Sequence, residues 1–211
     1  MGQLPDLQEA RRRLELALEP IPNDRWILGF LRGGCVQPIV TSEISQRFMR
    51  RHPLMPLSRK ALFERTPTVV NAVVQASESA DDYDWELDWP ALLYTPVARI
   101  GERPVGLLIL GSRTDHWYSE EEMAYARTLG VSLAPMVSAL RGPLGRLNET
   151  EALVAQLLSH GFSPLEMARA MGADERRMRS VAEKVARRLQ SVPADQFALP
   201  PIKVRRVTWL P

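Results

Sequence analysis

Hydrophobic residues in the first part of the chain follow a helical spacing at first and a strand-like spacing afterwards. Residues 7–18 are apolar at every third or fourth position, which predicts an amphipathic helix. The short apolar runs "RWILGFL" (25–31) and "CVQPIVT" (35–41) are separated by "RGG", a pattern typical of a β-hairpin. Further along, we expect short helices over residues 42–49 and 58–64.

The middle of the chain contains a second predicted hairpin and the longest predicted helix. The acidic and aromatic stretch 75–90 lacks a regular period, which indicates a long loop. Residues 91–100 and 105–114 are β-type runs around the polar turn "GERP", and they predict an antiparallel hairpin. Ser119 opens a capping box, and the apolar spacing after it predicts a helix that ends near Leu140. This order of elements predicts an α+β domain in which an antiparallel sheet carries helices.

Three further helices are predicted within residues 147–189. Asn148 is placed to cap the first of them. Ser163 is followed by a proline and, at the third position, by a glutamate, which indicates the start of the second helix. Gly172 breaks that helix, and Asp174 caps the third one shortly afterwards. Helix, short turn, helix is the pattern of a helix-turn-helix motif.

The third of these helices separates an apolar stripe from a charged face. Met178, Val181 and Val185 share one stripe at 3.6 residues per turn, so the charged side chains between them face away from it. Arginine suits a helix that reads DNA because its planar guanidinium group grips a guanine edge or a phosphate with two hydrogen bonds. The alternative is a face that is merely solvated, as most charge runs are. The candidate DNA-binding residues are Arg176, Arg177, Arg179, Ser180, Glu183, Lys184 and Arg187.

Charge is distributed unevenly between the two ends of the chain. The 211 residues include 27 Lys and Arg against 25 Asp and Glu, a formal net charge of +2. Residues 146–211 hold 11 of the basic and 7 of the acidic residues, which gives +4 there and leaves −2 for residues 1–145. A basic C-terminal third on a mildly acidic body is expected of a module that binds a polyanion.

The segment 92–140, "LLYTPVARIGERPVGLLILGSRTDHWYSEEEMAYARTLGVSLAPMVSAL", resembles the strands and terminal helix of the GAF family of sensory domains. The resemblance extends over about residues 7–140. It implies a six-stranded sheet with a small-molecule pocket on one face, and dimers formed through the flanking helices. Trp85, Trp89 and Tyr94 lie where the mouth of such a pocket is expected, which makes them candidate ligand-binding residues. Packing in the core is the alternative use of these rings.

The segment 147–189, "LNETEALVAQLLSHGFSPLEMARAMGADERRMRSVAEKVARRL", resembles the LuxR-type DNA-binding domain and aligns with it without a gap. The residues that match the framework of this family are Glu151, Gly161, Ser163, Glu166, Ala168, Gly172 and Leu189. The sequence departs from the family at Thr150, where an arginine is usual, and at 177–178, where a threonine-valine pair is usual. Prolines at 200–201 cut short the fourth, dimerising helix of the family. The resemblance implies that the third helix contacts duplex DNA.

The sequence carries no motif of a catalytic or metal site. Its three histidines are scattered, and HExxH, G-x-S-x-G and P-loop patterns are absent. Cys35 is the only cysteine, so the catalytic disulfide of GAF relatives that reduce methionine sulfoxide cannot form, and Cys35 is expected in a strand. Asp81, Asp82 and Asp84 resemble a carboxylate cluster, but we expect them to solvate a loop. We therefore expect no enzymatic activity, no metal and no cofactor.

Nothing in the sequence predicts a membrane protein or an exported one. No stretch approaches the roughly 20 apolar residues of a membrane span. The N-terminus is charged where a signal peptide needs an apolar centre. Together with the single cysteine, these features predict a cytoplasmic location.

These observations predict a GAF-like sensor domain over residues 1–141, a hinge over 142–146, a LuxR-type helix-turn-helix domain over 147–192 and a C-terminal tail over 193–211. The leading hypothesis is a cytoplasmic transcriptional regulator that binds double-stranded DNA, and whose sensor domain takes a small molecule or mediates dimerisation. The alternative is a non-enzymatic interaction protein with a vestigial helix-turn-helix that binds a protein partner. The strand-like segment 203–209 favours this alternative because it is suited to pairing with a sheet edge.

We also expect a homodimer held by the GAF-like helices. The shortened fourth helix leaves the DNA-binding part little surface for self-association, so the contacts are expected elsewhere. The candidate contacts are Leu14, Leu18, Leu129 and Leu133.

Overall fold

Six strands form one antiparallel sheet in the computed structural model, which describes residues 7–44, 51–71, 90–114 and 117–190. Their spatial order is β3-β2-β1-β6-β5-β4, and every neighbouring pair is antiparallel. The predicted α+β class with an antiparallel sheet is confirmed. The strands are β1 (Arg25–Arg32), β2 (Cys35–Thr41), β3 (His52–Pro53), β4 (Thr68–Asn71), β5 (Ala91–Val97) and β6 (Gly106–Ser112).

Both predicted hairpins are present. The first is closed by Gly33 (φ 56°) and Gly34 (φ 75°), which lie between the paired residues Arg32 and Cys35. Two consecutive positive φ values match the twist of the strands in a two-residue turn, and glycine adopts them without a steric penalty. The second hairpin joins β5 to β6 through a longer turn. These turns fix the register in which apolar residues alternate between the two faces of the sheet.

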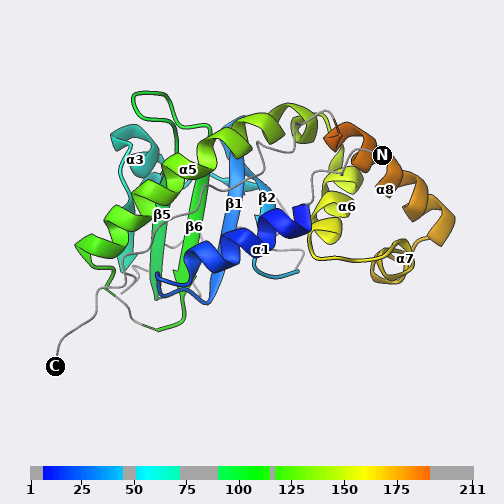
Figure 1. Cartoon of the computed structure of the whole chain (residues 1–211), viewed down its shortest axis with the longest axis horizontal. Helices are drawn as coiled ribbons and strands as arrows, with labels where there is room; N and C mark the ends of the chain where they lie inside the picture. Colours follow the sequence, from blue (N-terminus) through cyan, green and yellow to red (C-terminus); the bar gives the residue numbers. More distant parts are fainter. Residues whose placement is uncertain (1–6, 45–50, 72–89, 115–116, 191–211) are drawn as a thin grey trace, which may run out of the picture.

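Helices cover both faces of the sheet. α1 (Leu7–Leu18) and α5 (Glu120–Gly145) lie across one face (Figure 1). α3 (Pro56–Glu64), which confirms the helix predicted over 58–64, packs on the other face. Leu93 of β5 joins the core beneath α1 and α5, whereas Tyr94 joins the core beneath α3. Alternate residues of a strand point to opposite faces, so one strand supplies both cores.

Glycine lets α5 approach the sheet closely. A Cβ atom added at Gly130 would lie 2.4 Å from the carbonyl oxygen of Pro96 in β5. A Cβ atom at Gly106 in β6 would lie 2.4 Å from the carbonyl oxygen of Gly29 and 2.8 Å from Val137 of α5. Neither position accepts a side chain unless the helix or a strand moves.

α5 is longer than its apolar spacing predicts. It continues past Leu140 to Gly145, so the residues predicted to form a hinge lie in its last turn. Leu140 and Leu144 are both buried in the main core, which holds this turn helical although Pro143 lies within it. Of the helix predicted over 42–49, residues 42–44 are described and are not helical, while 45–49 lie outside the described residues. The loop predicted over 75–90 lies outside them except for residue 90.

Three helices follow α5: α6 (Glu149–Ser159), α7 (Pro164–Met171) and α8 (Glu175–Leu189). Their predicted starts are confirmed. The cap residues Asn148 and Ser163 each form a reciprocal capping box with the glutamate three residues later. Asp174 accepts a hydrogen bond from the backbone N–H of Arg177, and Gly172 ends α7 in the left-handed region at φ 59°. Each boundary is therefore encoded by residues next to it in the sequence.

α6 is attached directly to the sheet. The Gln156 side chain is buried, and its Nε2 donates hydrogen bonds to the carbonyl oxygens of Pro38 (2.8 Å) and Ile39 (3.0 Å) in β2. His160, at the end of α6, lies with its Nε2 3.3 Å from the hydroxyl of Thr41. One continuous cluster of buried hydrophobic side chains runs from the sheet through α6 into α7 and α8. The C-terminal helices are therefore packed against the sheet-bearing part (Figure 1).

The four leucines predicted to hold a dimer are core residues. The exposed fraction is 0% for Leu14, Leu129 and Leu133 and 1% for Leu18. They lie on the inner faces of α1 and α5 and pack in the core of their own chain. They are therefore not available to a second copy, and the prediction of these contacts is wrong. Among the helices that the structure describes, none is long and apolar enough to cross a membrane.

Candidate functional site

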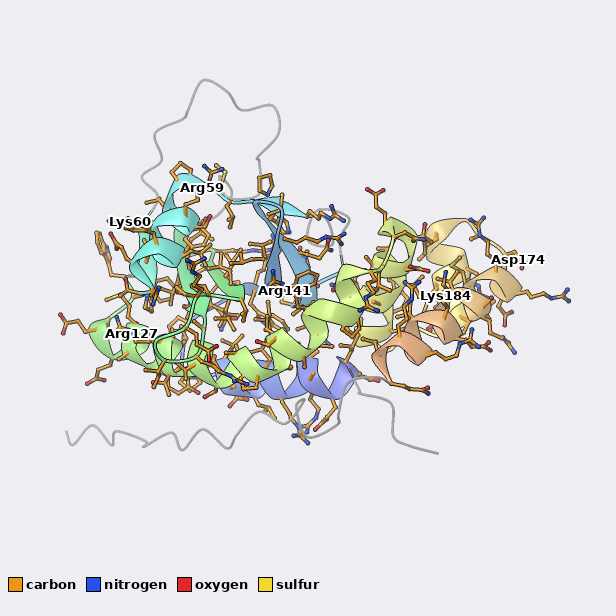
Figure 2. All side chains as sticks on the ribbon, turned by 90° about the horizontal axis from the view of Figure 1, so that it is seen from above. Arg59, Lys60, Arg127, Arg141, Asp174 and Lys184 are labelled. Carbon is orange, nitrogen blue, oxygen red and sulfur yellow. The ribbon has the colours of Figure 1, made fainter. Side chains whose placement is uncertain are left out.

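The outer face of α8 presents the residues predicted to contact DNA. Met178 and Val185 are buried against α6 and α7, with exposed fractions of 1% and 0%. All of the predicted contact residues are exposed. Figure 2 shows Asp174, the cap of α8, at the opposite end of the molecule from Arg59 and Lys60 of α3. The exposed residues are Arg176, Arg177, Arg179, Ser180, Glu183, Lys184 and Arg187.

Ion pairs divide this set into two groups. Lys184 is bound through its Nζ, 2.6 Å from an oxygen of the buried Glu151 in α6, so it faces the helix bundle. Arg179 pairs with Glu175 one turn earlier in α8, at 2.7 Å between Nη2 and Oε1. Within the described part of the chain, Arg176, Arg177 and Arg187 make no ion pair, so these three arginines and Glu183 carry the unpaired charge of the face.

The sequence did not reveal the role of Glu151 between the helices. Its carboxylate accepts a hydrogen bond from Arg188 at 2.8 Å and from the backbone N–H of Asn148 at 3.0 Å. The hydrogen bond from Lys184, the backbone hydrogen bond from Asn148 and the nearby charges together hold the pKa of Glu151 below its ordinary value. The capping box was the only signal in the sequence, and it indicated a helix start rather than a cation partner.

The predicted ligand-binding aromatics do not form a described site. Tyr94 is 1% exposed and belongs to the core cluster between the sheet and α3, which also contains Leu92, Ile109 and, from α3, Ala61. Its burial is that of a core residue, which favours the alternative given for it above. Trp85 and Trp89 lie outside the described residues.

Two clefts open at the edges of the sheet-bearing part. A cleft of about 270 Å³ lies between the end of α3, the β5–β6 turn and α5, and Arg65, Arg99 and Arg127 line it. Arg65 adopts the left-handed conformation at φ 56°, which is uncommon for a residue with a side chain. An open groove of about 520 Å³ lies between the β1–β2 turn and the end of α5; we call it the hairpin groove. No pattern in the sequence indicated either cleft.

Cys35 begins β2 and is partly exposed, as a strand position predicts. Across residues 7–44, 51–71, 90–114 and 117–190, no group of three His, Cys, Asp or Glu side chains is arranged to hold a metal ion.

Comparison with known proteins supports the fold of the sheet-bearing part. No family model and no curated protein matches the chain. Among solved structures, the GAF domain of a phosphoenolpyruvate-protein phosphotransferase from Coxiella burnetii is similar at 22% identity, with a TM-score of 0.51 over 68% of this chain and 88% of that one. The GAF domain region of a Geobacter sulfurreducens protein matches at 18% identity and a TM-score of 0.51, over 64% of this chain and 94% of that one. The GAF domain/HD domain protein of Geobacter sulfurreducens matches at 17% identity and a TM-score of 0.50, over 65% and 95%. About two thirds of the chain therefore has a GAF-like fold.

Proposed function

We propose that the protein is a non-enzymatic transcriptional regulator whose α7 and α8 form a helix-turn-helix that binds double-stranded DNA. The observation that carries the proposal is the outer face of α8, which holds three exposed and unpaired arginines: Arg176, Arg177 and Arg187. They follow a turn in which Gly172 and Asp174 fix the direction of α8. A recognition helix needs this combination of an anchored inner face and a cationic outer face.

The GAF-like part is the proposed sensor. The fold provides a platform on which small clefts open beside α5, and α5 leads directly into α6. A ligand that binds one arrangement of these helices more tightly than another would shift their equilibrium and change DNA affinity. A homodimer also belongs to this proposal, and its contacts must involve side chains other than the four buried leucines.

Fluorescence anisotropy with the full chain and labelled duplex DNA tests the proposal. We expect binding that weakens as salt rises, because each phosphate contact releases condensed cations. The double variant Arg176→Ala/Arg177→Ala should lose most of this binding. Arg103→Ala on the β5–β6 turn is the matched control, since it removes an exposed arginine far from α8 and should bind as wild type does.

The second candidate is the interaction protein with a vestigial helix-turn-helix. One observation favours it: Arg179 and Lys184, two of the predicted contacts, are engaged in ion pairs within the chain. If the wild-type chain binds no duplex above background at low salt, this candidate replaces the regulator. Selection of duplexes from a random library would define the preferred sequence if binding is found.

A further inference from the structure

The hairpin groove gathers three arginines from separate parts of the chain. Arg32 comes from the end of β1, Arg141 from the last turns of α5, and Arg146 from the junction with α6. All three are exposed, and none of the described residues that line the groove is acidic. Figure 2 shows Arg141 midway between the α3 end of the molecule and α8. The groove is therefore separate from the outer face of α8.

These three charges are not neutralised within the described part of the chain. The guanidinium groups of Arg32, Arg141 and Arg146 make no ion pair there. Like charges that converge on one space repel each other, and this repulsion is screened only over about 8 to 10 Å at physiological salt. An anion in the groove relieves the repulsion. A phosphate group suits it best because the planar fork of arginine donates two parallel hydrogen bonds to phosphate oxygens.

The rest of the lining suits a small ligand. The remaining lining consists of the glycines of the β1–β2 turn, the glycines at the end of α5 and the apolar residues Phe30 and Leu31. Glycine leaves the backbone open to close approach by a ligand. The volume of about 520 Å³ lies within the range of roughly 300 to 1,000 Å³ that is usual for small-molecule sites. A nucleotide or a shorter phosphate compound fits into such a space.

We propose that the hairpin groove binds a small phosphate-bearing anion no larger than a nucleotide. A hydrogen bond to the backbone of Arg146, one of the lining residues, links such a ligand to α8. Arg188 of α8 donates a hydrogen bond from Nη1 to the backbone carbonyl oxygen of Arg146 at 3.1 Å. An anion that fixes Arg146 thereby also fixes the end of α8. Binding in the groove stands without DNA, while a regulatory role for it rests on the proposed function.

Isothermal titration of the full chain with inorganic pyrophosphate and with ATP tests the site. We expect saturable binding of at least one of the two, weakened at least tenfold in Arg141→Gln. Arg103→Gln removes the same charge outside the groove and should bind as wild type does. The proposal is overturned if wild type binds neither compound, or if both variants bind equally well.

A second pair of variants separates charge from size. Gly142 lies in the groove, and a Cβ atom added there meets no atom within 4 Å, so a side chain is accommodated. Gly142→Glu places a carboxylate among the arginines, whereas Gly142→Gln adds a side chain of the same size without charge. We expect Gly142→Glu to bind at least tenfold more weakly than Gly142→Gln. Equal affinities of the two variants would contradict an anion site.

Measurements of duplex binding distinguish two sources of phosphate in the groove: a small free ligand, and the backbone of bound DNA. Under the proposal, Arg141→Gln binds duplex as tightly as wild type when no ligand is present. If wild type binds no pyrophosphate or ATP and Arg141→Gln weakens duplex binding, the groove contacts the DNA backbone and the small-ligand proposal is wrong. If wild type binds pyrophosphate but no duplex, the anion site stands and the DNA-binding function fails.

Discussion

A single buried carboxylate joins α6 to α8. One oxygen of Glu151 contacts Lys184, while the other contacts Arg188 and the backbone N–H of Asn148. The side chain is 5% exposed, so water does not replace these partners. Removing one member of a buried ion pair is costly because the remaining charges are left without compensation.

Glu151→Gln should lower the free energy of unfolding by about 1 to 3 kcal/mol at pH 7. The depressed pKa of Glu151 sets the pH dependence, because the unfolded chain binds its proton first as the pH falls. The stabilisation is fully present above the ordinary carboxyl pKa of 4.5 and is lost as the pH falls through the folded value. Urea denaturation at pH 7 and pH 4 measures both effects. Glu149→Gln in the exposed first turn of α6 should change stability little.

His160 should make stability sensitive to mild acid. Burial, and secondly the charge of Arg11, lower the pKa of His160 from 6.5 to about 4. Between these values the unfolded chain is protonated at this residue and the folded chain is not, so stability falls as the pH drops through this window. Melting temperatures from pH 7 to pH 5 should therefore decrease less in His160→Gln than in wild type. An identical decrease in both proteins would rule out this histidine as the cause.

Side-chain interactions between residues close in the chain could be predicted from the sequence. The caps Ser119, Asn148 and Ser163 form as predicted because their partners lie three residues away. The ion pair of Lys184 was not predicted, because its partner is a carboxylate in another helix. The run of charged residues therefore predicted the exposed face of α8, but it did not show which of these residues form ion pairs within the chain.

At the scale of single elements, α8 should show a gradient of DNA contacts. Arg176 lies near the start of the helix, and Arg187 lies about three turns further on. If the start of α8 enters a major groove, Arg176→Ala should weaken specific binding by about 1 to 3 kcal/mol. Arg187→Ala should weaken binding less, and equally for all sequences, because it reaches only backbone. Anisotropy titrations over a salt series measure both; equal effects on specific and random duplexes for the two variants would contradict the predicted orientation.

Replacing a glycine of α5 by alanine should lower the stability of the protein at one position and raise it at another. Gly130→Ala forces a methyl group against the carbonyl of Pro96, so we expect a loss of about 1 to 3 kcal/mol of stability. Gly142→Ala meets open space in a helix, so we expect a gain of about 0.5 to 1 kcal/mol from helix propensity. Urea midpoints of the two variants test this. A stabilised Gly130→Ala would show that α5 moves away from the sheet at little cost.

The ends of elements show which boundaries depend on long-range contacts. Local signals predicted where α6, α7 and α8 begin. The glycines and proline at 142–145 suggested a hinge, yet burial of Leu144 keeps this turn helical. Composition alone does not reveal such packing, because the core cluster that Leu144 joins contains residues from distant segments of the chain.

At the scale of the whole molecule, the continuous core predicts one cooperative unfolding transition. The buried side chains of α6 and α8 belong to the same cluster as those of α1, α5 and the sheet. Far-UV circular dichroism, which reports the helices, and tryptophan fluorescence, which reports Trp26 in β1 among others, should give coincident urea transitions. Two separate midpoints would show that the C-terminal helices unfold independently.

The two hydrogen bonds from Gln156 to β2 also decide where this protein can be cut for a chimera. A fusion of residues 147–190 to a foreign sensor would leave the amide of Gln156 without the carbonyls of Pro38 and Ile39, and would expose the apolar residues of α6 that β2 and α1 now cover. The uncovered apolar surface costs several kcal/mol, and a unit of three short helices has too small a core to lose that much and stay folded. A fusion that keeps these three helices folded therefore needs a segment that replaces β2, and a fragment that begins after α5 does not contain one.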